Sequence, residues 1–445
     1  MSTTVPGTQI SFLDRGAVEE LQSDRLRTQL AYVVAESPFY RDKFAAAGVD
    51  PASVRSTDDL HLLPFTDKSE LRDSQKQHPP LGSHAAASMR DVVRVHASSG
   101  TTGRPSYVGV TAADADAWGE VAARVFECQG LTADDIVLHA LGLGFFVGGL
   151  PLVEGVQRLG ATSIPIGIGA TDRLIQSTRD LAANVLFCTP SFARYLAEHM
   201  REKLGLDPRT LGFTKILVGA EPGGSLPAVR AEIEANYGAP VYESIGNADV
   251  FPIYSSMCEA FEGNHLLAED HVAFELIDPE TGDVLPWEDG VEGELVTTHL
   301  TRNCVPLVRF RTRDRVLVRT SPCLCGRTSP RITCIGRTDD LLIVNGVNVW
   351  PSAVSDVVSS FNPRTTGAME IVIAGEPPIA PPPLRIRVEY SSDATDLVAL
   401  KSELEAHIRE ALIARASVEL VPAGTLQRSE AKSRLVRIEP AGDAQ

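Results

Sequence analysis

Hydrophobic positions recur with two different periods along the chain. Near the N-terminus, Leu21, Leu26, Leu30 and Val33 recur at near-helical spacing with charged residues between them, which predicts helix over residues 17–48. From about residue 91 to 300, short β-rich segments alternate with helical patterns such as TDRLIQSTRDLAA and LPAVRAEIEANYG. The strand-like segments of this region are DVVRVHA, DIVLHAL, ATSIPIG, NVLFCT, KILVGA and APVYES. This alternation predicts an α/β fold with a largely parallel arrangement of strands.

The pattern changes toward the C-terminus. HVAFELI, GELVTTHL and RVLVRT look like antiparallel strands. Beyond them come a hairpin candidate (DDLLIVNGVNVWP), a helix (SAVSDVVSSF), two strands (MEIVIAG and LRIRVEY), a second helix from Leu397 to Leu412 and a last strand (SVELVP). We therefore expect a large N-terminal domain over 1–336, with a helical segment over 1–90, and a small α+β domain over 337–445.

Composition narrows the function classes. The chain has 445 residues and a formal net charge of −17, which argues against a nucleic-acid binder or a protein of anionic membranes. Its most apolar run, ALGLGFFVGGLPLV, is too short for a membrane helix, and no secretory signal is visible. Seven cysteines do not suggest a disulfide framework. These features favour a cytoplasmic enzyme or binding protein.

One loop is rich in small polar residues. In HASSGTTGRPSYVGVT, two glycines and four hydroxyl side chains lie together at Ser98, Ser99, Gly100, Thr101, Thr102 and Gly103. Such a loop is either a flexible polar turn or a cradle for phosphates, because glycine allows close backbone approach and hydroxyls donate to anion oxygens. The usual P-loop spacing is absent and the loop has no lysine. A phosphate ligand would therefore need a cation from elsewhere.

Four residues form a candidate metal set. Cys258, His265, Cys323 and Cys325 give the Cys₃His composition of a structural zinc site. The C-x-C spacing is tighter than the common C-x₂-C, and buried free cysteines are the alternative.

The motifs together resemble the phenylacetate–CoA ligase family of the adenylate-forming superfamily. The resemblance covers nearly the whole chain and rests on the order of LRTQLAYVVAESPFYRDKFAAAGVDP, LPFTDKSELRD, HASSGTTGRPSYVGVT, GLGFFVGG, CTPSFARYLAE, VGAEP, PLVRFRTRD, GRTDDLLIVNGVNVWP and RSEAK. It implies a large multi-sheet adenylate-forming domain and a mobile C-terminal lid. It also implies that ATP and Mg²⁺ activate a carboxylic acid as its adenylate, which the thiol of coenzyme A then attacks. Related ligases carry a similar cysteine and histidine pattern, and relatives suggest a homodimer.

The resemblance also assigns roles to residues. Ser98–Gly103 would hold the departing pyrophosphate, and Lys432 would be the catalytic lysine, although the family's preceding glycine is Ala431 here. Asp314 would bind the ribose, with Arg313 in place of the family's glycine. The remaining assignments are the adenine-lining segment Gly219, Ala220, Glu221 and Pro222, Arg337 near ribose and phosphate, and Asp339 at the hinge between the domains. An ordinary surface ion pair is the alternative for Arg337 and Asp339.

The largest departure from the superfamily lies in YESIGNADV. The best register places Ile245, Gly246, Ala248 and Asp249 where relatives have tyrosine, glycine, threonine and glutamate. Asp249 would then bind Mg²⁺ through a shorter side chain. An alignment of this segment with the superfamily motif that is shifted by a few residues is the alternative.

Two further assignments concern the acid and the thiol. Phe146, the TPSF segment and the residues around Ile245 and Gly246 would form an apolar acyl pocket suited to an aryl or similar acid, unless these side chains are simply core. Gly346 would line the passage for the pantetheine arm, and a plain hairpin glycine is the alternative. An amine or a carrier-protein thiol as acceptor, and a degenerate homologue without turnover, stay open as other functions.

Overall fold

The protein is described here by a computed structural model that covers residues 8–98, 106–375, 377–426 and 435–439. Its contacts divide the chain into two units, one of 1–167 with 244–333 and one of 168–243 with 334–445. The boundary between the two domains, which the sequence places after residue 336, stays a prediction. Among the described residues, no helix is both long and apolar enough to cross a bilayer.

The N-terminal segment folds into helices, as predicted, but residues 17–48 do not form one helix. The helices are α1 (Arg15–Glu36), α2 (Pro38–Ala47) and α3 (Lys68–Gln77). The break falls at Ser37 because Pro38 lacks a backbone N–H and disfavours a helical conformation in the residue before it. Leu26, Leu30 and Val33 are buried in the core beneath α1.

A run of antiparallel strands within a larger sheet forms a second part of the first unit. Its strands follow the order β11-β10-β12-β13-β14-β9-β8-β7. Their bounds are β7 (Val241–Asn247), β8 (Phe251–Met257), β9 (Asn264–Leu266), β10 (Val272–Ile277), β11 (Val284–Leu285), β12 (Glu292–His299), β13 (Phe310–Arg319) and β14 (Arg331–Arg337). The antiparallel pairing predicted for HVAFELI, GELVTTHL and RVLVRT is confirmed, because β10, β12 and β13 are antiparallel neighbours.

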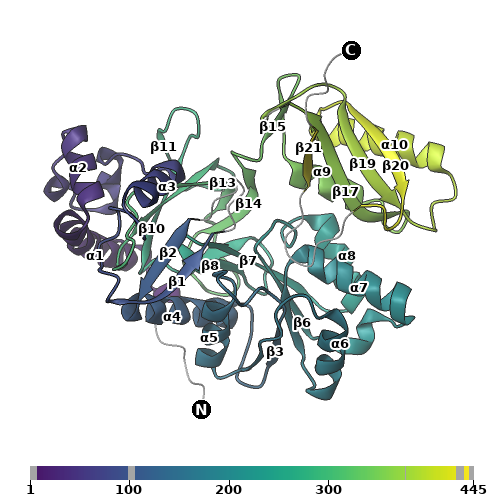
Figure 1. The fold of residues 1–445 in the computed structure, drawn as a ribbon, viewed down its shortest axis with the longest axis horizontal. Coiled ribbons are helices and arrows are strands. Elements are labelled where there is room, and N and C mark those ends of the chain that lie inside the picture. Colours follow the sequence, from purple (N-terminus) through teal and green to yellow (C-terminus); the bar gives the residue numbers. More distant parts are fainter. Residues whose placement is uncertain (1–7, 99–105, 376, 427–434, 440–445) are drawn as a thin grey trace. The chain divides into compact units, whose positions relative to one another are not determined.

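Two pairs of strands complete this unit. Strands β3 (Ile136–His139) and β4 (Thr162–Ile164) are parallel, as expected, and helices α4 (Ala112–Cys128) and α5 (Leu150–Leu159) pack side by side (Figure 1). Strands β1 (Val92–Ala97) and β2 (Tyr107–Thr111) form a separate antiparallel pair. The segment DVVRVHA is therefore outside the parallel arrangement, since the connection between residues 98 and 106 is too short for a parallel crossover.

The second unit contains the remaining parallel strands and the C-terminal α+β fold. Strands β5 (Val185–Cys188), β6 (Lys215–Val218) and the start of β7 are parallel, and their helices are α6 (Thr171–Asp180), α7 (Pro190–Leu204) and α8 (Pro227–Tyr237). The C-terminal strands are β15 (Leu342–Val344), β16 (Val347–Val349), β17 (Thr365–Ala374), β18 (Ile379–Ala380), β19 (Leu384–Tyr390), β20 (Ala416–Pro422) and β21 (Val436–Glu439). Helices α9 (Pro351–Ser359) and α10 (Leu397–Leu412) pack with the β20-β19-β17-β21 sheet around one core (Figure 1). The predicted mixed α/β fold with a small α+β unit at the C-terminus is confirmed.

Candidate active site and metal centre

The predicted phosphate loop closes the β1–β2 hairpin. Ser98 is buried, its backbone N–H donates to Ser106 O at 2.9 Å, and the N–H of Ser106 donates to Ser98 Oγ at 3.3 Å. The other predicted phosphate residues, Ser99–Gly103, lie outside the described residues, as does Lys432. What the structure describes is the anchored base of this loop.

The predicted Mg²⁺ ligand sits between β7 and β8. Asp249 is 4% exposed, and its backbone N–H donates to Asn247 Oδ1 at 3.0 Å. Its Oδ2 accepts from Lys68 Nζ at 2.6 Å. Gly246 lies where the two strands come close, since a Cβ at this position would meet Pro252 O at 1.9 Å. A glycine is therefore required here by backbone packing, whatever its role toward a substrate.

Two of the predicted acyl-pocket residues pack against the same apolar cluster. Phe146 and Ile245 are partly buried, and both contact a core that includes Val147, Phe251 and Tyr254. The backbone N–H of Ala97 donates to Phe145 O at 2.9 Å, and Ala97 bridges Phe146. The predicted pocket residue Phe146 therefore lies at the end of β1, next to the base of the phosphate loop.

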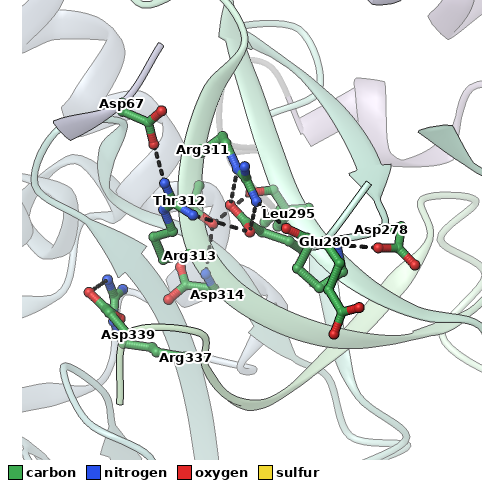
Figure 2. A network of polar contacts seen from close by, with 12 residues as sticks. Asp67, Asp278, Glu280, Leu295, Arg311, Thr312, Arg313, Asp314, Arg337 and Asp339 are labelled. Atoms are coloured by element: carbon green, nitrogen blue, oxygen red, sulfur yellow. Dashed lines mark hydrogen bonds and ion pairs between the residues drawn. The ribbon is translucent and has the colours of Figure 1, made fainter. Parts of the chain in front are cut away.

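Asp314 lies in a polar network on β13. It is 8% exposed, and its backbone N–H donates to Thr312 Oγ1 at 3.1 Å (Figure 2). The residue before Thr312, Arg311, makes a two-pronged ion pair with the buried Glu294, at 3.0 and 2.6 Å. Arg313 pairs with Asp67, the N-cap residue of α3 (Figure 2). These contacts fix the backbone on both sides of the predicted ribose ligand.

The backbone at Arg313 has a conformation that favours glycine. Its φ is +67°, in the left-handed region that side chains rarely adopt. The ion pair with Asp67 partly offsets this conformational cost.

We expect Arg313→Gly to be more stable than Arg313→Ala by about 1 kcal/mol, because both variants lose the Asp67 contact and only alanine keeps the backbone strain. The first unfolding transition in urea measures this difference. Asp67→Asn is the control, because it removes the ion pair and leaves residue 313 unchanged. Equal stability of the alanine and glycine variants would contradict the strained backbone.

The predicted adenine segment follows β6 in the second unit. The N–H of Gly219 donates to Cys188 O at 3.3 Å, and Ala220 has a φ of +71°. Glu221 Oε1 accepts from the N–H of Ser191 at 2.8 Å, in the first turn of α7. A carboxylate is favoured at a helix N-terminus. The Glu221 side chain therefore has a structural role, which leaves backbone groups of Gly219–Pro222 for ligand contacts.

Residues predicted around the hinge have clear local environments. Arg337 and Asp339 form a two-pronged ion pair with each other, at 2.9 and 3.0 Å, in the part of the chain shown in Figure 2. Asn345 and Gly346, with φ of +50° and +80°, form the turn between β15 and β16. Two residues of positive φ are typical of a two-residue hairpin turn, so local geometry alone explains this glycine.

The four predicted metal ligands converge. The ligand atoms of Cys258, His265, Cys323 and Cys325 all lie within 4.8 Å of one another. Cys258 Sγ is 3.5 Å from Cys323 Sγ, and Cys325 Sγ is 3.3 Å from His265 Nε2. His265 Nδ1 lies 3.1 Å from Ser329 Oγ, which orients the ring and leaves Nε2 toward the sulfurs. Three thiols and one imidazole at these separations fit a single tetrahedral ion.

Electrostatics at this cluster suit metal binding. Burial, together with Arg327 and Arg331, lowers the pKa of His265 to about 4, so its imidazole is neutral, as a metal ligand must be. Burial acts to raise the pKa of the Cys325 thiol, but hydrogen bonds from Arg327 and the neighbouring thiols lower it below its ordinary value. Burial raises the pKa of Cys258 to about 12. An added cation would favour its thiolate.

A second acidic and histidine cluster has a different explanation. Glu120, Asp270 and His271 also offer ligand atoms within 4.8 Å of one another. Arg124 is fully buried among them and pairs with Asp270 at 2.7 Å and with Glu120 at 2.9 Å. The arginine already supplies the positive charge, so this group is an internal ion-pair network.

Reasoning from the sequence assigned no role to Lys68, although its motif LPFTDKSELRD was part of the resemblance. Lys68 is the first residue of α3, where a positive charge is unfavourable next to the helix dipole. A lysine at this unfavourable position is the feature of the sequence that could have indicated a role for Lys68 outside the helix.

Comparisons with known proteins agree with these features. Residues 19–300 match the AMP-binding enzyme family and residues 346–438 match the AMP-binding enzyme C-terminal domain. The phenylacetate-coenzyme A ligase of Thermus thermophilus is 36% identical over 440 residues, covering 95% of this chain and 96% of the relative. The phenylacetate-coenzyme A ligase of Escherichia coli is 36% identical over 361 residues, covering 80% of each chain.

A solved structure matches this chain over as much of its length as these relatives do. The structure of 2-hydroxyisobutyryl-CoA ligase in the postadenylation state, with an acyl-AMP bound, has a TM-score of 0.90 and 31% identity, and covers 97% of this chain and 91% of that one. The match spans both the region of the candidate site and the C-terminal α+β fold. The chain therefore belongs to the AMP-binding enzyme family, with phenylacetate-coenzyme A ligases among its full-length relatives.

Proposed function

We propose that this protein is an acid–thiol ligase. It joins a carboxylic acid to the α-phosphate of ATP, with release of pyrophosphate, and then passes the acyl group to the thiol of coenzyme A, with release of AMP. The observation that carries this proposal is the similarity to phenylacetate-coenzyme A ligases over 95% of the chain, including the C-terminal region that matches its own family model.

The residues have complementary parts in this reaction. Ser98–Gly103 bind the pyrophosphate portion of ATP, Gly219–Pro222 line the adenine with backbone groups, and Asp314 accepts hydrogen bonds from the ribose hydroxyls. Lys432 provides a point cation between the carboxylate and the α-phosphate, where charge neutralisation lowers the barrier. Arg337 exchanges its partner Asp339 for ribose and phosphate, at the predicted hinge.

Asp249 is the residue that would hold Mg²⁺. A single buried carboxylate fits this ion, which is commonly bound through one or two carboxylates together with substrate phosphates. When bound, Mg²⁺ neutralises phosphate charge. In the second step, the turn at Gly346 borders the passage of the pantetheine arm, and its open side leaves room for that chain, since a Cβ there would meet nothing within 4 Å.

The proposed substrate is an aryl or similarly apolar acid. Phe146 and Ile245 pack against one apolar cluster, which supports an apolar environment for the acyl group. The named relatives that act on phenylacetate favour the same class.

We further propose a structural zinc ion bound by Cys258, His265, Cys323 and Cys325. The convergence of the four ligand atoms and the orientation of His265 by Ser329 support it. The ion would tie the β8–β9 region to the segment 323–325 that precedes β14. It has no part in the chemistry.

The resemblance to the family also suggests the oligomeric state and the location of the protein. We propose a homodimer in the cytoplasm, acting on a free carboxylic acid and coenzyme A. Light scattering on a sizing column measures the assembly directly.

The experiment that tests the function uses the purified protein with ATP, Mg²⁺ and a panel of acids. The panel contains phenylacetate, benzoate, 2-hydroxyisobutyrate and acetate, each with and without coenzyme A. Pyrophosphate release and mass spectrometry of AMP and thioester are the readouts, and an acyl-CoA from an aryl acid is the expected result. Pyrophosphate release with an acyl-adenylate but no thioester would favour an amine or a carrier-protein thiol as acceptor. No pyrophosphate release with any acid would favour a homologue without turnover.

A further inference from the structure

Helix α3 touches three of the segments proposed to bind ATP. Its N-cap residue Asp67 pairs with Arg313, the neighbour of the proposed ribose ligand. Its first residue Lys68 donates to Asp249 Oδ2 at 2.6 Å. Gln75 exchanges two hydrogen bonds with the backbone of Tyr107, of 2.6 and 3.1 Å, where the chain leaves the phosphate loop. These contacts all lie within the first unit.

The pairing of Lys68 with Asp249 is not explained by helix stability. A lysine at the first position of a helix meets the positive end of the helix dipole. Its side chain is 31% exposed, whereas that of Asp249 is 4% exposed. The buried carboxylate therefore needs a counter-charge, and the partly exposed lysine supplies it.

This counter-charge lies where the proposed function requires a metal ion. If Mg²⁺ bound the same carboxylate, its two positive charges would lie a few ångströms from the ammonium group, and the two cations would repel each other strongly at a site with little solvent. Binding of Mg²⁺ with ATP must therefore weaken or break the Lys68–Asp249 contact.

We propose that Lys68 is a positioning residue that competes with Mg²⁺ for the carboxylate of Asp249. It holds the carboxylate in place in the free protein and gives it up when ATP and Mg²⁺ bind, so that it sets the Mg²⁺ requirement of adenylation. This inference rests on the proposed function for the identity of the metal-bound substrate. In physical terms, the Lys68 ammonium group and Mg²⁺ compete for the same carboxylate, that of Asp249.

The test compares neutral and charged variants of Lys68. In Lys68→Met and Lys68→Gln the competing charge is gone, so the free Mg²⁺ concentration that gives half-maximal ATP–pyrophosphate exchange should fall about tenfold, as expected for losing a hydrogen bond between charged groups. Lys68→Arg keeps a cation and should stay within about twofold of the wild type.

A matched control separates competition from anchoring of the helix. Lys43, on α2, forms an ion pair with Glu70 of α3 and does not contact Asp249 in the structure. Lys43→Met therefore weakens the anchoring of α3 and should leave the Mg²⁺ requirement unchanged. A fall of similar size in this variant would overturn the proposal.

A second readout does not depend on turnover. Electron paramagnetic resonance of free Mn²⁺ measures metal binding in the presence of α,β-methylene ATP, which cannot release pyrophosphate and so cannot transfer its adenylyl group to an acid. The Mn²⁺ dissociation constant should fall about tenfold in the neutral variants. An unchanged constant, or a higher one, in folded Lys68→Met and Lys68→Gln overturns the inference. If the wild type shows no exchange with any acid, the proposed function fails, while the Mn²⁺ measurement still decides on Lys68.

Discussion

Replacing Lys432 by alanine should reduce ATP–pyrophosphate exchange by about 10²–10³-fold, the usual cost of removing one group that stabilises developing charge. The physical reason is that an acid anion and a phosphate repel each other, and a point cation between them lowers this repulsion in the transition state. The attack of coenzyme A on a supplied acyl-adenylate needs no such cation and should stay within about twofold of the wild type. Measuring both half-reactions on the same preparation checks the prediction.

Lys401→Ala is the matched control for Lys432. Lys401 lies on the exposed side of α10, 3.9 Å from Glu405, and its loss should change neither half-reaction. Lys432→Arg asks a finer question, because a planar guanidinium does not replace a compact ammonium at a position that needs a point charge. Undiminished ATP–pyrophosphate exchange in Lys432→Ala would show that the assignment of the catalytic lysine is wrong. Another cation would then have to be sought, and the departure from the family motif at Ala431 would be consistent with that outcome.

Loss of the proposed zinc ion should have the largest effect on stability. Cys323→Ser and Cys325→Ser each remove a ligand, so the purified protein should lose its single equivalent of zinc. The free energy of unfolding should drop by at least about 3 kcal/mol, because the energy of binding a structural metal adds to the energy of folding. For a domain of this size, the melting temperature should fall by roughly 5–10 °C. Elemental analysis and thermal unfolding give both numbers.

The control for the zinc variants is another cysteine with similar exposure. Cys334 is partly buried, as Cys325 is, and does not belong to the converging set. Cys334→Ser should keep the zinc and most of the stability. A metal content of zero in wild-type protein grown with added zinc, together with unchanged stability in Cys323→Ser, would refute the metal site. The three thiols and the imidazole would then be ordinary packed side chains.

Local sequence patterns determined most of the secondary structure. The alternation in LRIRVEY and the apolar spacing at Leu400, Leu404 and Ile408 reappear as β19 and α10, with those three residues buried in one core. Residues two or three to four apart in the chain are enough to define such patterns. The break between α1 and α2 shows the limit of periodicity, because one proline ended a helix whose apolar spacing continues.

Motif order determined the family and the candidate residues, since the phosphate loop, Asp314 and Lys432 were assigned from their place in a chain-long resemblance. Local geometry has given several of these residues further reasons to be there. Gly246 is required by the approach of Pro252, and Gly346 by a hairpin turn. Such residues are predictable from sequence even where their role toward a substrate stays a prediction.

Only the tertiary structure decided which of these residues meet. Lys68 and Asp249 are 181 positions apart, and Cys258 and Cys323 are 65 apart, so no local period relates the members of either pair. The ion pair between Arg313, which has a positive φ, and Asp67 likewise joins residues that are far apart in the chain. The sequence by itself determined the elements, the family and the chemistry that each side chain can offer. The tertiary structure decided which charges neutralise one another and which ligands converge, because those energies depend on distances between segments that only the folded chain brings together.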